Sequence, residues 1–370
     1  MKKFLLLYVL ASVSLASCVN DESLELTQQP KKLSFEAPVM KTQSRAGEGN
    51  VEHHYGEISG ISYPTTESFM VFAKQHTGNL TDWKNAANFW GKELPALEVK
   101  YNNSESAKYW DTDTDYYWPS DDNIYLSFGA YSPATLNQGA TATYTNEGLR
   151  IEDFAVNGTV ANQVDLMYSG PILNKSYKEN AVAGVAVEFK HALSSIVFSA
   201  IDADDNANYT INSIKVKGKF LKKGTFCENL SWSNGNATGT AGWSSVSVND
   251  EPTEYALATG LNVTVGTSST VITEGKSALL TIPHTKDQLD ANASVTITYT
   301  VTPTNGAPAY NIEKTVNLAD FKISENANIT SWEIGKRYTY QFSFGGTSKI
   351  FFRPTVSEWG NGGTATLTIN

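Results

Sequence analysis

Apolar and polar residues alternate along most of the chain with a period of two. The pattern is clearest over 294–302, where Val295, Ile297, Tyr299 and Val301 are separated by polar residues. Such alternation predicts strands with one buried face. We expect strands at 68–73, 123–130, 184–189, 195–201, 211–220, 294–302, 338–344 and 364–369. Short strands at regular spacing, divided by turn clusters, favour an all-β chain built of β-sandwiches.

Helix-like segments are few, and short helices are expected only at Thr81 to Ala87 and Lys286 to Leu289. The polar stretch Asn174 to Asn180 separates two apolar regions. We therefore expect an N-terminal β-sandwich domain over 46–178 and a C-terminal β-sandwich domain over 179–370. With 370 residues, the chain is long enough for two domains that each bury a core.

Residues 1–18 have the pattern of a lipoprotein signal. Lys2 and Lys3 precede the apolar run Phe4 to Val13, and Leu15 to Ser17 leads into Cys18. The apolar run is too short for a membrane span and typical of a removable secretory signal. Cys18 stands where the thiol that carries the lipid is expected. The alternative is an ordinary secretory signal in which Cys18 is incidental.

Residues 19–45 combine a polar tether with a strand-like pattern. The apolar positions of this pattern are Leu33, Phe35, Ala37 and Val39. The alternation predicts a half-buried strand, and Pro38 would confine it to the edge of a sheet. Arg45 follows in the stretch 43–50, which contains two glycines and is exposed to proteases.

Composition argues against nucleic acid as a partner. The net charge is -10 and the isoelectric point is near 5.1, whereas phosphate groups attract clustered lysine and arginine. If Cys18 carries a lipid, Cys227 is the one thiol left, and it is expected to be an apolar packing residue rather than a nucleophile.

Nothing in the sequence has the spacing of a catalytic or metal centre. The histidines are scattered at His53, His54, His76, His191 and His284. His191 lies between apolar strands, where a hydrogen-bonded structural histidine is expected. A nucleophile elbow, a phosphate loop and a zinc pattern are all missing from the sequence. We therefore expect no enzyme activity, no cofactor and no metal.

The acidic loop 111–115 offers one alternative to this view. Asp111, Asp113 and Asp115 alternate, and Asp122 follows eleven residues after Asp111, a spacing similar to that of a calcium loop. Tyr116 stands where such a loop has glycine, so a solvated acidic loop is the competing interpretation. The aromatic residues nearby, including Trp110 and Trp118, would either stack on sugars or pack in a core.

Several segments together resemble the fimbrillin family of Bacteroidales, which contains type V pilins and their accessory subunits. The segments are 116–119 (YYWP), 125–133 (YLSFGAYSP), 165–168 (DLMY), 187–196 (VEFKHALSSI), 280–283 (LTIP), 332–335 (WEIG), Tyr338, Tyr340 and 356–359 (VSEW). Each segment alone has little specificity, and their order along most of the chain carries the resemblance.

The resemblance implies two tandem transthyretin-like (Greek-key) β-sandwich domains and a lipoprotein precursor at the outer membrane. In this family, a trypsin-like or arginine-specific protease cuts after an arginine in the N-terminal region and releases the first strand. Arg45 and Ala46 match the cleavage position, and Leu33 to Val39 match the removable strand. A neighbouring subunit then fills the groove with its C-terminal strand. Here Ala365, Leu367 and Ile369 are placed to serve as that donor strand.

The expected partners are therefore other fimbrial subunits, identical or related, which bind by strand addition. The expected location is the surface of the outer membrane, and the fimbrium after processing. The resemblance includes stalk, anchor and tip members of the family alike. The alternative function is that of a tip or surface adhesin that binds host glycan or protein.

Overall fold

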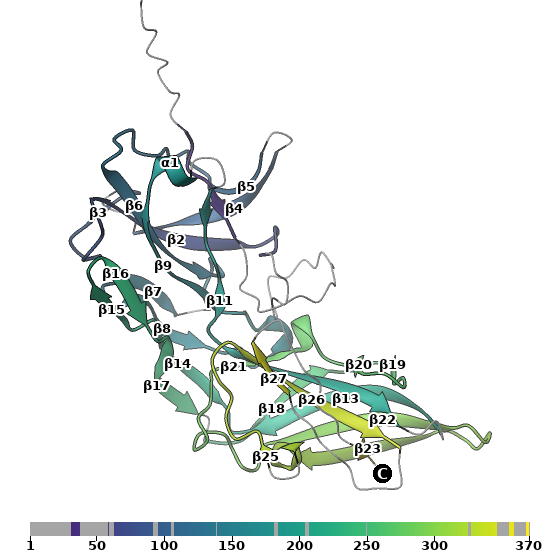
Figure 1. Cartoon of the computed structure of the whole chain (residues 1–370). Helices are drawn as coiled ribbons and strands as arrows, with labels where there is room; N and C mark the ends of the chain where they lie inside the picture. Colours follow the sequence, from purple (N-terminus) through teal and green to yellow (C-terminus); the bar gives the residue numbers. More distant parts are fainter. Residues whose placement is uncertain are drawn as a thin grey trace, which may run out of the picture. The chain divides into compact units, whose positions relative to one another are not determined.

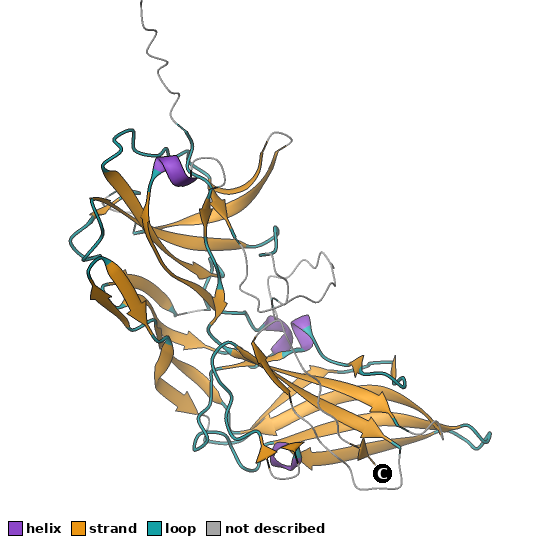
Figure 2. Cartoon of the chain, viewed as in Figure 1, coloured by secondary structure: helices purple, strands orange, loops and turns teal. Residues whose placement is uncertain are grey.

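The computed structural model describes residues 31–37, 58, 63–91, 95–104, 107–137, 139–180, 184–203, 207–248, 250–324, 327–345, 355–358 and 368–369. Strands dominate this part of the chain (Figure 2), which confirms the all-β expectation. Its short helical elements are α1 (Tyr177–Asn180) and the 3-10 turns η1 (Val160–Asn162), η2 (Gly275–Ser277) and η3 (Leu318–Asp320). The described residues include no helix that is long and apolar enough to cross a membrane.

The largest sheet formed by the described residues has nine strands, several of which are labelled in Figure 1. Its spatial order is β10 (Val185–Ala186), β1 (Phe35–Glu36), β5 (Ala107–Thr112), β4 (Ala96–Ser104), β2 (Ser68–Thr77), β6 (Ile124–Ser132), β9 (Met167–Lys175) and β11 (Lys190–His191), with β3 (Ala87–Asn88) paired to β2 outside this path. The strands of this sheet enclose a cluster of buried apolar side chains that we call the N-terminal core. Every residue of this core that lies on a strand belongs to this sheet.

Strand β2 shows why an unbroken apolar run can still be a strand. Phe69, Val71 and Ala73 point into the N-terminal core. Phe72, on the opposite face, packs in a second core that we call the shared core. Because both faces of β2 are covered, the sequence of this strand contains few polar positions before Lys74.

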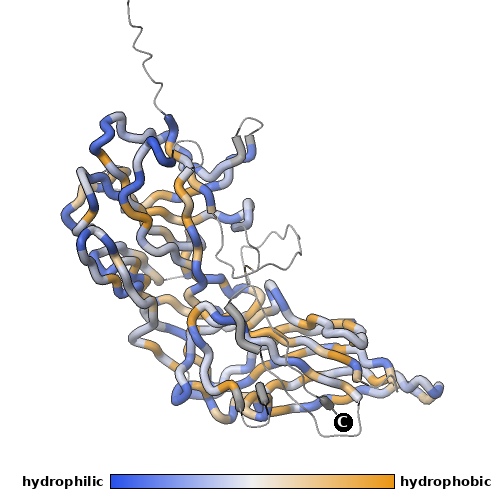
Figure 3. Tube along the Cα trace, viewed as in Figure 1, coloured by the Kyte–Doolittle hydropathy of each residue, from blue (hydrophilic) through white to orange (hydrophobic). Residues whose placement is uncertain are grey.

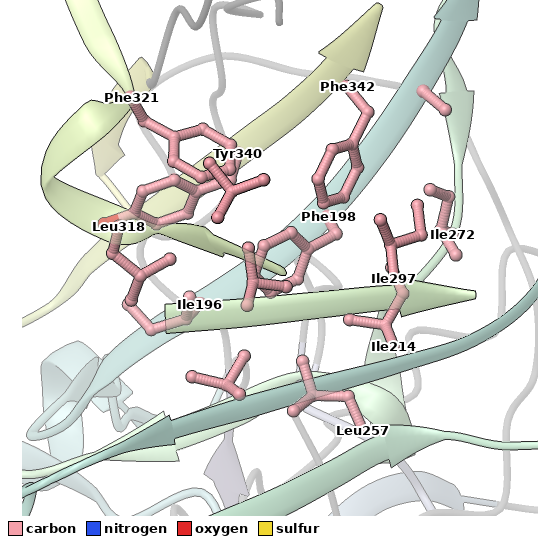
Figure 4. Packing of buried hydrophobic residues seen from close by; sticks show 14 of the residues in the cluster. Ile196, Phe198, Ile214, Leu257, Ile272, Ile297, Leu318, Phe321, Tyr340 and Phe342 are labelled. Carbon is pink, nitrogen blue, oxygen red and sulfur yellow. The ribbon is translucent and has the colours of Figure 1, made fainter. Parts of the chain in front are cut away.

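Two sheets pack face to face around the C-terminal core. One contains β20 (Thr270–Val271), β12 (Ser194–Asp202), β26 (Lys336–Phe344) and β27 (Thr355–Glu358), with β21 (Leu279–Thr281) on β12 and β28 (Thr368–Ile369) on β26. The other contains β18 (Thr253–Ala258), β13 (Ala207–Gly218), β22 (Ser294–Pro303) and β23 (Tyr310–Asn317), with β19 (Val263–Thr264) on β13. Figure 4 shows Phe198, Phe342, Ile214 and Ile297 meeting between these layers.

A further sheet joins residues from both halves of the chain. Its order is β17 (Gly242–Val248), β14 (Leu221–Cys227), β8 (Gly148–Ala155) and β7 (Thr141–Thr145). Strand β8 precedes the expected division at residue 178 and pairs with β14, which follows it. One face of this sheet, together with the faces of β2 and β6 that carry Phe72 and Tyr131, forms the shared core. The pairs β15 (Leu230–Ser233) with β16 (Asn236–Gly239) and β24 (Lys322–Ser324) with β25 (Ala327–Asn328) complete the strands.

Hydrophobic positions gather along the strands, and the loops that join them are mostly hydrophilic (Figure 3). Both expected helices are wrong, because residues 83–85 and 286–288 form turns. At the first of these turns, the Asp82 carboxylate accepts the backbone N–H groups of Lys84 and Asn85, which favours a turn over a helix.

Candidate functional site

The candidate site is the place where the N-terminal segment 31–37 enters the nine-stranded sheet. Strand β1 pairs in parallel with β10, with Phe35 opposite Val185 and Glu36 opposite Ala186. It pairs antiparallel with β5, with Phe35 opposite Trp110. The expectation that this strand would lie at a sheet edge is therefore wrong, since β1 has a neighbour on each side. Pro38, on which that expectation rested, lies outside the described residues.

Backbone hydrogen bonds extend this pairing beyond β1 in both directions. They run from Leu33 N–H to Tyr116 O (2.7 Å), Trp118 N–H to Lys31 O (3.1 Å), Val185 N–H to Ser34 O (2.9 Å), Val187 N–H to Glu36 O (2.7 Å) and Tyr63 N–H to Ala37 O (3.0 Å). The segment is thus bonded along its length to residues on both sides, as an inserted strand would be.

The apolar side chains of the segment fill the N-terminal core. Leu33, Phe35 and Ala37 are buried, and the Phe35 ring meets Phe128 edge to face at 5.6 Å. The predicted inward alternation is confirmed at these three positions, while Val39 lies outside the described residues. Burial of a leucine or phenylalanine side chain contributes about 1.5–3 kcal/mol. The segment is therefore an integral part of the wall of this core.

Gly184 lets the segment approach β10 closely. Its φ angle is +86°, and a Cβ at this position would lie 3.2 Å from Ser34 O. Glycine alone adopts this backbone conformation without strain and also leaves room for the neighbouring chain. Gly184 thus stands directly before the stretch in which β10 pairs with β1, which starts at Val185.

A lysine of the segment binds the acidic loop. Lys32 Nζ lies 2.6 Å from Asp111 Oδ2 and 2.6 Å from Asp115 Oδ1. The Asp111 side chain is only 10% exposed, whereas that of Asp115 is 53% exposed. Partial burial lowers the pKa of Lys32, but the hydrogen bonds to Asp111 and Asp115 outweigh it and hold the pKa above its ordinary value. The ammonium group is therefore charged at any physiological pH.

Asp113 of the acidic loop, and Asp122 beyond it, bind other lysines. Asp113 lies 3.2 Å from Lys100, and Asp122 lies 2.5 Å from Lys178. Among the described residues, no group of three or more acidic, histidine or cysteine side chains is arranged to hold a metal ion. The alternation of aspartates thus gives ion pairs with three separate lysines, rather than the convergent oxygens of a calcium loop.

The two tryptophans of this region are core residues. Trp110 and Trp118 are 6% and 5% exposed, and both belong to the N-terminal core. Stacking on a sugar needs an open ring face, so neither residue can serve the adhesin hypothesis in this conformation. The core interpretation is confirmed for these two tryptophans, whereas the neighbouring Tyr117 is 44% exposed.

Other residues singled out in the sequence have structural roles. His191 Nδ1 lies 3.1 Å from Asp165 Oδ1, and both side chains are buried, as expected for a structural histidine. Cys227 is a buried free thiol in β14, in keeping with packing. The ring of His76 forms hydrogen bonds with Gly78 O and with the Ser127 hydroxyl. His53 and His54 lie outside the described residues.

A buried glutamate beside the shared core has no counterpart in the sequence pattern. Glu228 accepts the backbone N–H of Leu149 at 2.7 Å and is 2% exposed. Burial raises its pKa to about 7, against the smaller opposing effects of that hydrogen bond and of Lys190. The bond spans 79 residues, so no local pattern could have found it.

At the other end of the chain, the described part of the expected donor strand lies on β26. Strand β28 pairs in parallel with β26, with Thr368 opposite Ser343 and Ile369 opposite Phe344. Strand β27 pairs with the preceding half of the same edge. Ala365 and Leu367 lie outside the described residues, as do Cys18, Arg45 and Ala46.

The sequence over 65–359 matches the model of a known family, described as fimbrillin-like. The chain belongs to the fimbrillin-like family. The resemblance seen in the sequence is thereby confirmed over most of this fimbrillin-like chain. No curated protein matches it.

Three solved structures from Bacteroidales are similar to this fimbrillin-like chain. A candidate cell adhesion protein from Bacteroides uniformis shares 15% identity, with a TM-score of 0.45 over 89% of this chain and 99% of its own. One from Bacteroides ovatus shares 13%, with a TM-score of 0.42 over 92% and 99%. The fimbrial anchor protein Mfa2 from Porphyromonas gingivalis shares 12%, with a TM-score of 0.24 over 83% and 90%. At such low TM-scores, these structures carry no functional conclusion for this chain.

Proposed function

We propose that this chain is a structural subunit of cell-surface fimbriae that assembles by exchange of its N-terminal strand. The observation that carries the proposal is the position of segment 31–37, which lies between β5 and β10 and fills the N-terminal core. Removal of a strand from inside a sheet leaves a groove, whereas removal of an edge strand does not. The proposal assigns no catalytic role to any residue.

The groove would be a binding site for another strand. Without the segment, β5 and β10 present unpaired N–H and C=O groups, and the places of Leu33, Phe35 and Ala37 become an apolar slot. An incoming strand of alternating apolar residues satisfies both needs at once. Contacts of this head-to-tail kind do not close into a ring, so they produce a filament.

Processing would control the exchange. The proposed precursor is a lipoprotein held at the outer membrane through lipid on Cys18, and a trypsin-like or arginine-specific protease cuts between Arg45 and Ala46. Before the cut, segment 31–37 is tethered to its own groove, where its effective concentration excludes a competitor. After the cut, the segment is free to dissociate.

The donor would be a C-terminal strand, for which Ala365, Leu367 and Ile369 supply the alternating residues. The position of β28 on β26 fits a donor that rests against its own subunit before exchange. Two transthyretin-like (Greek-key) sandwiches, expected from the sequence over 46–178 and 179–370, are part of this proposal, with β10 and β11, which follow residue 178, paired in the N-terminal sheet. The two-layered C-terminal core supports the second of these.

The proposal is tested by blocking the cut in cells that assemble the protein. Arg45→Ala should leave a membrane-bound monomer whose N-terminal residue is the lipidated Cys18, while the parent yields polymers that begin at Ala46. Lys41→Ala is the matched control, because it removes a nearby basic residue and should leave assembly intact. Intact mass and N-terminal sequencing of sheared material give the readout. Polymers formed by the Arg45→Ala variant would contradict the protease switch.

A second variant tests the donor. Deletion of residues 364–370 should leave cleavage at Arg45 unchanged and abolish addition of this chain's strand to its neighbour. Undiminished polymerisation after that deletion would show that another strand is the donor.

A further inference from the structure

We propose that the groove of segment 31–37 selects an incoming strand with a lysine or arginine directly before its first inward apolar residue. The selected partner is then a subunit other than a second copy of this chain. This inference rests on the proposed function and specifies the partner of the same site. It is carried by the ion pairs of Lys32 and by the residues of the chain's own C terminus.

The groove contains a preformed binding site for a cationic side chain. Lys32 Nζ is shared by Asp111 and Asp115 at 2.6 Å each, and lies 5.8 Å from the centre of the Tyr109 ring. Asn102 Nδ2 donates to the same Asp111 oxygen at 3.2 Å. The Lys32 side chain is 25% exposed, so the ammonium is partly withdrawn from water.

Departure of the segment removes this cation and leaves the carboxylates behind. A new strand in the groove would cover Asp111 again, since its side chain is 10% exposed when the groove is filled. A carboxylate buried without a counter-charge is strongly unfavourable, and loss of one partner from a buried pair is the usual way to create that state. A strand with a basic residue at the place of Lys32 avoids this penalty.

The C-terminal strand of this chain has no such residue. When Ala365, Leu367 and Ile369 are aligned with Leu33, Phe35 and Ala37, Thr364 takes the place of Lys32. Residues 354–370 contain no lysine or arginine. A second copy of this chain would therefore cover Asp111 without neutralising it.

The apolar side chains of the two segments also differ in size at every aligned position. Alanine would replace Leu33, leucine would replace Phe35, and isoleucine would replace Ala37, which is buried with 8% exposure. The first two changes leave space unfilled, and the third adds atoms to a packed position, and both kinds of change are unfavourable. Size and charge therefore point to the same conclusion, that the groove fits a strand from a different subunit.

The test uses the full chain with a recognition sequence for a site-specific protease placed at the Arg45–Ala46 bond. After cleavage, fluorescent peptides compete for the groove, and polarisation reports their affinity. One peptide is residues 29–43, used unchanged and as the Lys32→Arg and Lys32→Gln variants. The other is residues 360–370, with and without Thr364→Lys. Each is measured on the parent protein, on Asp111→Asn, and on the control Asp122→Asn, which loses the same charge from a carboxylate that binds Lys178 instead of Lys32.

We expect Lys32→Gln to weaken the binding of peptide 29–43 about tenfold and Lys32→Arg to have little effect. Thr364→Lys should strengthen the binding of peptide 360–370 by a similar factor. Both of these differences in peptide affinity should vanish on the Asp111→Asn protein and persist on the Asp122→Asn protein. If Asp111→Asn does not fold, Asp115→Asn supplies the same comparison at a more exposed carboxylate, with a smaller expected reduction of both differences.

Two outcomes overturn the inference, and they separate it from the proposed function. If peptides exchange but lysine makes no difference, or unmodified peptide 360–370 binds as tightly as 29–43, charge selection is wrong and strand exchange stands. If no peptide, including 29–43 itself, enters the cleaved protein, then the exchange mechanism fails and the selection fails with it.

Discussion

The N-terminal and C-terminal cores bury similar side chains but are closed by very different strands. In the C-terminal core, β12 pairs with β26 over eight residues and β13 with β22 over ten. In the N-terminal core, β1 pairs with β10 over two residues and with β5 over one. The paired stretches of the segment that covers Phe128 are much shorter than those of β12 and β13, so we expect it to open locally at a lower free energy than the body of the sheets.

The largest test of this difference compares two buried phenylalanines. Phe35→Ala and Phe198→Ala should each remove about 3–5 kcal/mol of packing. The loss at Phe35 should appear chiefly as local opening, with faster hydrogen exchange at the amides of Leu33 and Val185. The loss at Phe198 should lower the free energy of unfolding measured with urea. If Phe35→Ala reduces protection in β12 as strongly as in β1, the two cores unfold as one unit.

One buried titratable group in each of two cores makes the stability of the shared core and of the C-terminal core depend on pH in opposite directions. Burial raises the pKa of Glu228 to about 7, so the folded state holds this proton more tightly and stability is lost as pH rises from the ordinary carboxyl range to 7. Burial lowers the pKa of His284 to about 4, against a hydrogen bond to Ile282 O. Its contribution is present above the ordinary histidine pKa and is lost as pH falls to 4.

The two effects oppose one another, and each amounts to about 3 kcal/mol. Glu228→Gln should therefore stabilise the protein above pH 7 and leave a stability curve that only rises between pH 4 and 7. Urea unfolding across that range measures the effect. Identical pH profiles for the parent and the variant would contradict the assignment to Glu228.

A smaller effect is expected from two glycines with positive φ angles. Gly184 has φ +86° and abuts Ser34, whereas Gly260 has φ +65° and open space around its Cβ position. Alanine at Gly260 should cost about 1 kcal/mol through backbone strain alone. Alanine at Gly184 should cost about 2 kcal/mol, because the new methyl group also pushes on the segment. Equal losses in thermal unfolding would show that the segment yields without resistance.

The smallest effect concerns two lysines that bind the same acidic loop. Lys100 and Asp113 are 48% and 80% exposed, so Lys100→Gln should change stability by no more than about 0.5 kcal/mol. Lys32→Gln leaves Asp111 covered and without a counter-charge, and should cost about 1–2 kcal/mol. Urea unfolding at low and high ionic strength measures both. A larger loss from Lys100→Gln than from Lys32→Gln would reverse this order.

Much of the strand pattern could be predicted because burial in a sheet leaves a local signal. The period of two at Leu33, Phe35 and Ala37 is enough to identify the inward face of the N-terminal segment. The same signal could not reveal that the strand has neighbours on both sides, because pairing with Val185 and Trp110 joins residues far apart in the sequence. For the same reason, the aspartates of loop 111–115 could not be assigned a lysine 79 residues away.

The all-β class, the family, the alternation of the N-terminal segment and the separation of charged from apolar positions can all be read from the residues alone. These depend on side-chain chemistry at neighbouring positions, which is written along the chain. The fold was needed to see that the segment fills the N-terminal core between β5 and β10, and that Lys32 neutralises Asp111 there. Both facts depend on which strands, far apart in the sequence, lie next to one another in the sheet, and no local pattern of residues contains that information.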